Sequence, residues 1–125
     1  MDDRKNRRVL VVDDDAQFLE ATRMMLEKHG YEVLTAQDGS QGLMRAERES
    51  PDLIVLDVMM PRRSGFGVLE RLGHRRPTGP RIVVVTGNEG SRDEEIARAK
   101  GADAFLKKPF EMRELLTAVD SLLTA

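Results

Sequence analysis

Carboxylates stand at the ends of two apolar, strand-like segments of this sequence. Three consecutive acids, Asp13 to Asp15, follow the run RVLVV at residues 8–12, and Asp57 ends the run LIVL at residues 53–56. Aspartate is common where strands give way to loops, so Asp57 has an ordinary interpretation as a turn residue. Its other interpretation is chemical, because a carboxylate held beside a cation can act as a nucleophile.

Two further strand-like segments end in groups that complement an acid. The run RIVVV at residues 81–85 is followed by Thr86, and the run AFL at residues 104–106 is followed by Lys107 and Lys108. In open parallel sheets, ligands bind outside the carboxyl ends of the strands. If the four strands are neighbours, their ends therefore place carboxylates, a hydroxyl and an ammonium in one pocket.

Acids crowded into one pocket favour a bound cation. Two carboxylates about 4 Å apart repel by roughly 4 kcal/mol at an effective dielectric constant of ~20, so Asp13, Asp14 and Asp57 must take up a proton or bind a metal ion. Mg²⁺ is a hard ion that prefers oxygen ligands and retains several waters, which fits this set. Because phosphoryl transfer needs mainly charge neutralisation and positioning, these residues suit the formation of an aspartyl phosphate on Asp57.

The elements that must position these groups alternate along the chain. Apolar or alternating runs predict strands at 8–12, 31–36, 53–56, 81–85 and 104–106. Helical spacing predicts one helix from Ala16 to about His29 and a second that carries Leu43, Met44 and Ala46 and ends before Pro51. It also predicts a short helix over residues 66–72 that Gly73 closes, and helices at 91–100 and about 111–123. The first, third and fourth strands are apolar throughout, as strands covered on both faces should be. The alternation predicts an α/β fold: a doubly wound (βα)5 sandwich with a five-stranded parallel sheet and helices on both faces.

Length and composition limit the possible functions. A chain of 125 residues suits one domain, with a folded core expected over about residues 7–124. The absence of Cys excludes disulfides and thiolate chemistry, and a net charge of −2 with no Trp argues against direct nucleic-acid binding by this domain. No apolar run approaches the roughly 18 residues of a membrane span, and the polar start MDDRKNRR lacks the apolar part of a signal peptide, so we expect a cytoplasmic protein without membrane contact.

Four segments of the chain, in their order and spacing, resemble one family. The segments VLVVDDD, DLIVLDVMMPRRSG, IVVVTG and GADAFLKKPF are similar to those of the receiver domain of bacterial two-component response regulators, along essentially the whole chain. The resemblance implies a flavodoxin-like fold of the kind found in chemotaxis-regulator receivers. It also implies a phosphoprotein of a two-component system or phosphorelay, which carries its phosphoryl group as an aspartyl phosphate.

The resemblance assigns a role to each residue of the pocket. Asp57 would be the phosphoacceptor, and Asp14 the principal acidic ligand of Mg²⁺, for which Mn²⁺ can substitute. Asp13 would act partly through water, and the backbone carbonyl of Met59 would be a further ligand.

Other residues would contact the phosphoryl group or respond to it. Thr86 would hydrogen-bond a phosphoryl oxygen, and Lys108 would pair with it. Lys108 is chosen over Lys107 because it directly precedes Pro109, which in the family follows a cis peptide bond. Phe105 would be an aromatic switch that turns inward as Thr86 moves, although a fixed core position fits Phe105 equally well.

Implied partners and output follow from the same family. A sensor histidine kinase, a histidine phosphotransfer protein or acetyl phosphate would donate the phosphoryl group, and the domain would catalyse only its own phosphoryl transfer and autodephosphorylation. The helix at 91–100 has few apolar residues to anchor it, so it would move, and together with the last strand and last helix it would form the output face. That face would bind an output protein or domain, or a second copy in a phosphorylation-dependent homodimer. Both a stand-alone receiver and the receiver of a longer regulator fit the sequence.

The chain departs from the family pattern at three positions. Gly87 follows Thr86 where the family usually has Ala, and the two positions that tune phosphoryl lifetime are Met59 and Asn88. Met59 has no acidic or amide group to orient an attacking water. We therefore predict slow self-dephosphorylation; rapid loss of label that Met59→Asn leaves unchanged would contradict this.

Simpler interpretations remain for several residues. Asp13, Asp14 and above all Asp15 could cap the following helix, where negative charge meets the positive end of the helix dipole. Lys107 could simply be solvated. The basic residues between positions 71 and 81 could form a phosphate or nucleic-acid patch; they are Arg71, His74, Arg75, Arg76 and Arg81.

Two other classes of function compete with the signalling switch. One is a constitutive interaction module that keeps the fold without being phosphorylated, against which the complete set of acceptor, acids and Lys argues. The other is a free-standing phosphatase that uses Asp57 covalently. Against this class, residue 59 is Met rather than a second acid, and no insertion is large enough to cover a substrate pocket.

Overall fold

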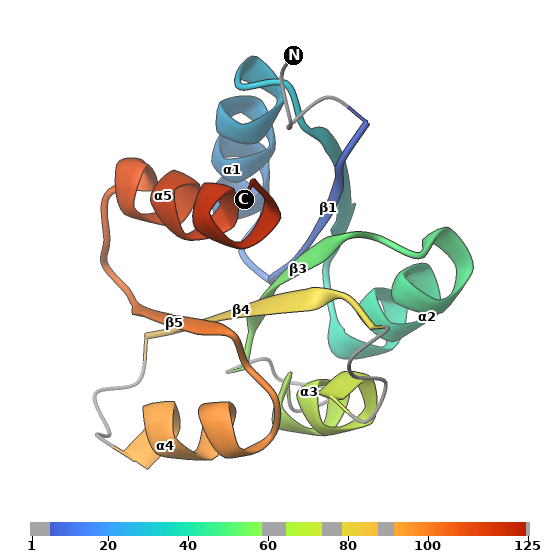
Figure 1. Ribbon diagram of the computed structural model, residues 1–125, viewed down its shortest axis with the longest axis vertical. Coiled ribbons are helices and arrows are strands. Elements are labelled where there is room, and N and C mark those ends of the chain that lie inside the picture. The colour runs from blue at the N-terminus through green and yellow to red at the C-terminus, as the bar shows by residue number, and fades with distance from the viewer. Residues whose placement is uncertain (1–5, 59–64, 74–78, 88–91, 125) are drawn as a thin grey trace.

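The computed structural model describes residues 6–58, 65–73, 79–87 and 92–124, and its elements alternate along the chain (Figure 1). The strands are β1 (Arg8–Val12), β2 (Glu32–Ala36), β3 (Leu53–Asp57), β4 (Arg81–Thr86) and β5 (Ala104–Lys107). The helices are α1 (Ala16–Lys28), α2 (Gly39–Glu49), α3 (Gly65–Gly73), α4 (Arg92–Ala99) and α5 (Met112–Leu123). No helix within the described ranges is long and apolar enough to cross a membrane.

All five strands run parallel in one sheet, in the order β2-β1-β3-β4-β5. This order places β1, β3 and β4 in the interior, and they are the three strands whose sequences are apolar throughout. The predicted α/β sandwich is therefore confirmed, with boundaries shifted by one residue at several ends. Strand β3, for example, extends to include Asp57.

Helices cover both faces of the sheet, with α1 and α5 on one side and α2, α3 and α4 on the other (Figure 1). Because neighbouring residues of a strand point to opposite faces, each interior strand supplies both layers of the core. In β1, Val9 and Val11 pack beneath α1 and α5, whereas Leu10 and Val12 pack beneath α2 and α3. The sheet is thus held from both sides, which fixes the positions of its strand ends.

Helix α1 begins directly at the acidic end of β1. The Asp15 side chain caps it, accepting hydrogen bonds from the backbone N–H groups of Gln17 and Phe18 at 3.0 and 3.3 Å, which confirms the cap predicted for this residue. The helix buries Leu19 and Leu26, which are seven residues apart on one face. Its start therefore stays close to the carboxyl end of β1.

Helices α2 and α4 cover the opposite face with unequal contact. In α2, Leu43 and Ala46 are buried as their spacing predicts, but Met44 is 53% exposed and is not part of the core. In α4, Ala97 is fully buried, whereas Ile96 is 40% exposed. The expectation that little apolar burial anchors α4 therefore agrees with its packing.

Candidate functional site

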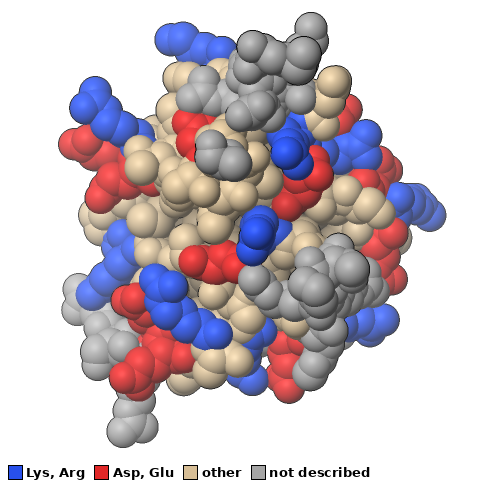
Figure 2. Space-filling model, viewed as in Figure 1, with Lys and Arg blue, Asp and Glu red and all other residues tan. Residues whose placement is uncertain are grey.

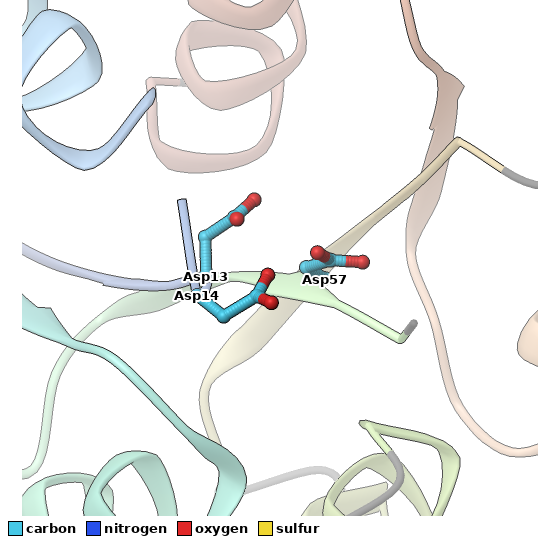
Figure 3. A group of neighbouring side chains, drawn as sticks. All are labelled: Asp13, Asp14 and Asp57. Atoms are coloured by element: carbon cyan, nitrogen blue, oxygen red, sulfur yellow. The ribbon is translucent and has the colours of Figure 1, made fainter. Parts of the chain in front are cut away.

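Three carboxylates meet where β1 and β3 end side by side. Strands β1 and β3 pair in register up to Val12 and Leu56, and the next residues along each strand are Asp13 and Asp57. Asp13, Asp14 and Asp57 each offer one carboxylate oxygen, and these three oxygens lie within 4.8 Å of one another (Figure 3). The sequence-based prediction that these three acids share a pocket is correct.

The surroundings of the three acids differ. Asp13 is fully buried and Asp57 is only 5% exposed, whereas Asp14 is open to solvent. Buried carboxylates are retained when they are paired or bind a cation. Two largely buried acids and one exposed acid, all offering oxygen, suit Mg²⁺, which would be held by protein oxygens on one side and water on the other. The Met59 carbonyl predicted as a further ligand lies outside the described residues.

Lys108 supplies the positive charge that faces the acids. Its ammonium Nζ lies 2.6 Å from Asp13 Oδ2 and 3.8 Å from Asp57 Oδ2. Lys108 reaches these acids although it follows β5, the edge strand on the far side of β4. Its backbone holds it there, because the Lys108 N–H donates to the Thr86 carbonyl at 2.7 Å and the peptide bond to Pro109 is cis, as the resemblance predicted. Lys107, which was interpreted as solvated, is exposed.

Thr86 and Phe105 lie on the two strands between Asp57 and Lys108. Thr86 ends β4 and is fully buried, one residue beyond Val85, which pairs with Asp57 in the ladder. Phe105, in the middle of β5, is partly buried against the core cluster on the α2–α4 side. The structure thus brings Thr86 to the strand ends beside Asp57. The partial burial of Phe105 is compatible both with a moving switch and with a fixed core position.

Two aromatic residues that the sequence did not assign to the site lie beside it. The Lys108 ammonium lies 4.2 Å from the centroid of the Phe18 ring, and Phe18 meets Phe110 edge to face at 6.0 Å between centroids. Phe18 matches the apolar spacing of α1, so periodicity alone indicates only a core position. The available signal was its place three residues after the Asp15 cap, in the first turn of α1.

The basic residues considered as a patch are dispersed. Arg71 lies 3.3 Å from Glu47, and Arg81 lies 3.7 Å from Asp103; His74, Arg75 and Arg76 are outside the described residues. On the face shown in Figure 2, Lys and Arg alternate with Asp and Glu rather than forming one broad region of a single sign. The ion pairs of Arg71 and Arg81 therefore do not favour a phosphate or nucleic-acid patch that includes these two residues.

Comparisons with known proteins point in one direction. Residues 9–120 match the profile of the family described as the response regulator receiver domain. By sequence, the chain is 39% identical over 118 residues to the alkaline phosphatase synthesis transcriptional regulatory protein PhoP of Bacillus subtilis, a match that covers 94% of this chain and 49% of PhoP. The chain thus spans about half the length of such relatives.

Solved structures agree with the sequence comparisons. A CheY-like receiver domain protein from Methanospirillum hungatei superposes with a TM-score of 0.88 at 35% identity, covering 94% of this chain and 93% of that one. The response regulator TrrA from Thermotoga maritima, solved in complex with Mg²⁺ and BeF, gives a TM-score of 0.83 at 30% identity, covering 94% and 99% of the two chains. Both structures share the fold, and the second binds a metal together with a beryllium fluoride.

Proposed function

This chain belongs to the response regulator receiver domain family of two-component signal transduction, and from that premise we propose that Asp57 is its phosphoacceptor. The observation that carries the proposal is the arrangement of Asp13, Asp57 and Lys108, in which two buried carboxylates face one ammonium at 2.6 and 3.8 Å. A constitutive interaction module would have no use for this arrangement. The proposed function is therefore a signalling switch set by phosphorylation.

The proposed reaction is a displacement at phosphorus. An oxygen of Asp57 attacks the phosphorus atom of the donor, either a phosphohistidine of a kinase or phosphotransfer protein, or an acyl phosphate. A new O–P bond forms at Asp57 as the bond to the donor nitrogen or oxygen breaks, and the leaving group keeps that electron pair. The donor supplies all of the energy, so the domain needs only to position the reactants and neutralise charge.

The residues around Asp57 divide this work. Asp13, Asp14 and Asp57 would hold Mg²⁺, or Mn²⁺ in its place, and the bound ion would neutralise charge on the transferring phosphoryl oxygens. Lys108, which follows the edge strand β5, provides a second positive charge, and its Nζ already lies 3.8 Å from Asp57 Oδ2. Thr86 would donate a hydrogen bond to a phosphoryl oxygen from the buried end of β4.

We propose that the output lies on α4, β5 and α5. New charge on Asp57 would draw Thr86 and Lys108 inward and bias Phe105 and the lightly anchored α4 between two arrangements. The chain would act in the cytoplasm, and its upstream partner would be a sensor histidine kinase or a histidine phosphotransfer protein. The partner that binds the phosphorylated form would be an output domain, a separate protein or a second copy of this chain. The domain would catalyse no reaction beyond its own phosphorylation and slow dephosphorylation.

The test is uptake of a phosphoryl group from acetyl phosphate, followed by intact mass with and without Mg²⁺. We expect the wild type to gain one phosphoryl group only when Mg²⁺ is present, and Asp57→Asn to gain none. Glu95→Gln is the matched control, because it makes the same carboxylate-to-amide change at an exposed position of α4. That control should be labelled like the wild type.

The competing functions predict different results. No uptake in any condition by a folded wild type would favour the constitutive module. Repeated turnover of small phosphate esters, rather than a single stable label, would favour a phosphatase. Uptake by Asp57→Asn equal to that of the wild type would remove Asp57 from the reaction.

A further inference from the structure

We propose that Phe18 is a positioning residue for phosphoryl transfer, whose ring holds the Lys108 ammonium within reach of Asp57. The inference rests on the proposed function and adds to it a residue outside the set of acids, hydroxyl and Lys. It starts from one measured contact, the 4.2 Å between Lys108 Nζ and the centroid of the Phe18 ring. A cation at this distance from an aromatic ring is attracted by its negative face.

Phe18 is linked through Asp15 to Asp13, one of the two acids that Lys108 faces. The Asp15 N–H donates to Asp13 Oδ1 at 2.9 Å, and the Phe18 N–H donates to Asp15 Oδ1 at 3.3 Å. Lys108 then donates to Asp13 Oδ2 at 2.6 Å and lies against the Phe18 ring. These contacts form a closed circuit from Asp13 through Asp15 and Phe18 to Lys108 and back to Asp13. The third acid of the DDD run therefore serves the site by placing the ring.

The ring also packs against a second aromatic residue. Phe18 and Phe110 meet at 6.0 Å with their planes at 89°, an edge-to-face arrangement that aromatic pairs prefer. Phe110 lies two residues after Lys108, so the same turn that carries the ammonium also carries the support of the ring. Ring and ammonium thus form one unit built across α1 and the segment after β5.

This unit limits where a long, flexible side chain can go. The Lys108 side chain is 24% exposed, so without a wall its ammonium could swing into water. The Phe18 ring favours positions near Asp13 and Asp57 and desolvates one side of the ammonium, which strengthens its attraction to charge developing at Asp57. A lysine confined in this way needs only a short movement from Asp13 to a phosphoryl group on Asp57.

The contact itself can be tested by NMR in the absence of metal and donor. Protons on the Lys108 Cε should be shifted upfield by the ring current of Phe18. We expect this shift to persist in Phe18→Tyr, which keeps an aromatic face, and to disappear in Phe18→Leu. Met25→Leu is the control, since Met25 is a similarly half-buried apolar residue of the same helix.

Its role in the reaction needs a second measurement, the rate of phosphorylation by acetyl phosphate at saturating Mg²⁺. We expect Phe18→Leu to slow labelling about three- to tenfold, the range of a partly desolvated cation–π contact, and Phe18→Tyr to restore most of the rate. In a Lys108→Ala background, Phe18→Leu should cause no further loss. If the ring served only to pack the core, Phe18→Leu would lower the labelling rate by the same factor in the wild type and in the Lys108→Ala background.

The outcomes separate the inference from the function on which it rests. A labelled wild type with equal rates in Phe18→Leu and Phe18→Tyr overturns the role of Phe18 and leaves the switch intact. An additional loss in the Lys108→Ala background, of the same size as in the wild type, also overturns it. A wild type that takes up no phosphoryl group removes the proposed function and this inference together.

Discussion

At the scale of single residues, the site concentrates negative charge that the folded chain must tolerate. Oxygens of Asp13, Asp14 and Asp57 lie within 4.8 Å of one another, and the Lys108 ammonium lies closer to Asp13 than to Asp57. Such crowding opposes folding until a cation arrives. Functional sites commonly retain destabilising groups of this kind.

The exposed acid, Asp14, gives the cleanest measure of this cost. We expect Asp14→Asn to raise the free energy of unfolding of the metal-free protein by about 1 kcal/mol, because it removes one of three mutually repelling charges in a partly solvated place. The same change should abolish the rise in thermal midpoint that Mg²⁺ gives the wild type. Thermal unfolding with EDTA and with Mg²⁺ measures both. An equal Mg²⁺ effect in both proteins would show that Asp14 is not a ligand.

At the scale of elements, α3 and α4 end against one another without side chains between them. A Cβ added at Gly73, the last residue of α3, would lie 2.2 Å from the Lys100 carbonyl oxygen, and Gly101 adopts a φ of +114° beside it. Only glycine fits such a close approach of two backbones. This contact fixes the C-terminal end of α4, whereas the rest of the helix has little buried apolar surface.

Adding a methyl group at this contact should therefore be costly. We expect Gly73→Ala to destabilise the protein by about 2 kcal/mol or more, since the neighbour that must move is backbone. Gly67→Ala in the same helix is the matched control. It meets nothing within 4 Å and should stabilise the protein by about 0.5–1 kcal/mol. Urea unfolding of both variants gives the comparison, and equal stabilities would contradict the close packing.

Helix α4 carries a second feature, a buried acid in its first turn. Asp93 is 9% exposed, and within the part of the chain that the structure describes its Oδ2 has no hydrogen-bond partner. An unsatisfied buried oxygen costs about 1–3 kcal/mol, more than the roughly 0.3–1 kcal/mol that an acid gains at a helix N-terminus. Asp93 therefore weakens the seating of α4 against the sheet.

Removing that oxygen should tighten α4. We expect Asp93→Ala to stabilise the protein by about 1 kcal/mol, whereas Glu95→Ala, at an exposed position of the same turn, should be neutral or slightly destabilising. Chemical denaturation of the two variants measures the difference. If Asp93→Ala is the less stable of the two, the carboxylate does not destabilise the protein.

At the scale of the whole molecule, the two halves of the sheet differ in how firmly they are packed. Strands β1 and β3 are interior and bear the acids, while β5 is an edge strand and α4 is lightly packed. We expect beryllofluoride with Mg²⁺ to change amide hydrogen exchange over residues 91–110 and to leave β1 nearly unchanged. The Asp57→Asn variant under the same conditions is the control. Identical protection of residues 91–110 with and without the mimic would exclude α4 and β5 as the switch.

The sheet and its acids were predictable because each depends on local sequence. Uninterrupted apolar runs identify β1, β3 and β4 as interior strands, and the carboxyl ends of neighbouring parallel strands must meet, so Asp13 and Asp57 follow. The Phe18–Lys108 contact was not predictable, since a helical apolar position is compatible with core and site alike. The Gly73–Gly101 approach depends on how two helices seat, which periodicity does not report.

The central claim is that one carboxylate, Asp57, accepts the phosphoryl group. The most direct measurement is to label the wild type with acetyl phosphate and Mg²⁺, reduce it with borohydride, and locate the product by peptide mass. Reduction converts an aspartyl phosphate into homoserine and so marks the residue that carried it. We predict homoserine at position 57 alone. Homoserine at position 13 or 14 instead, with position 57 unchanged, would contradict the account.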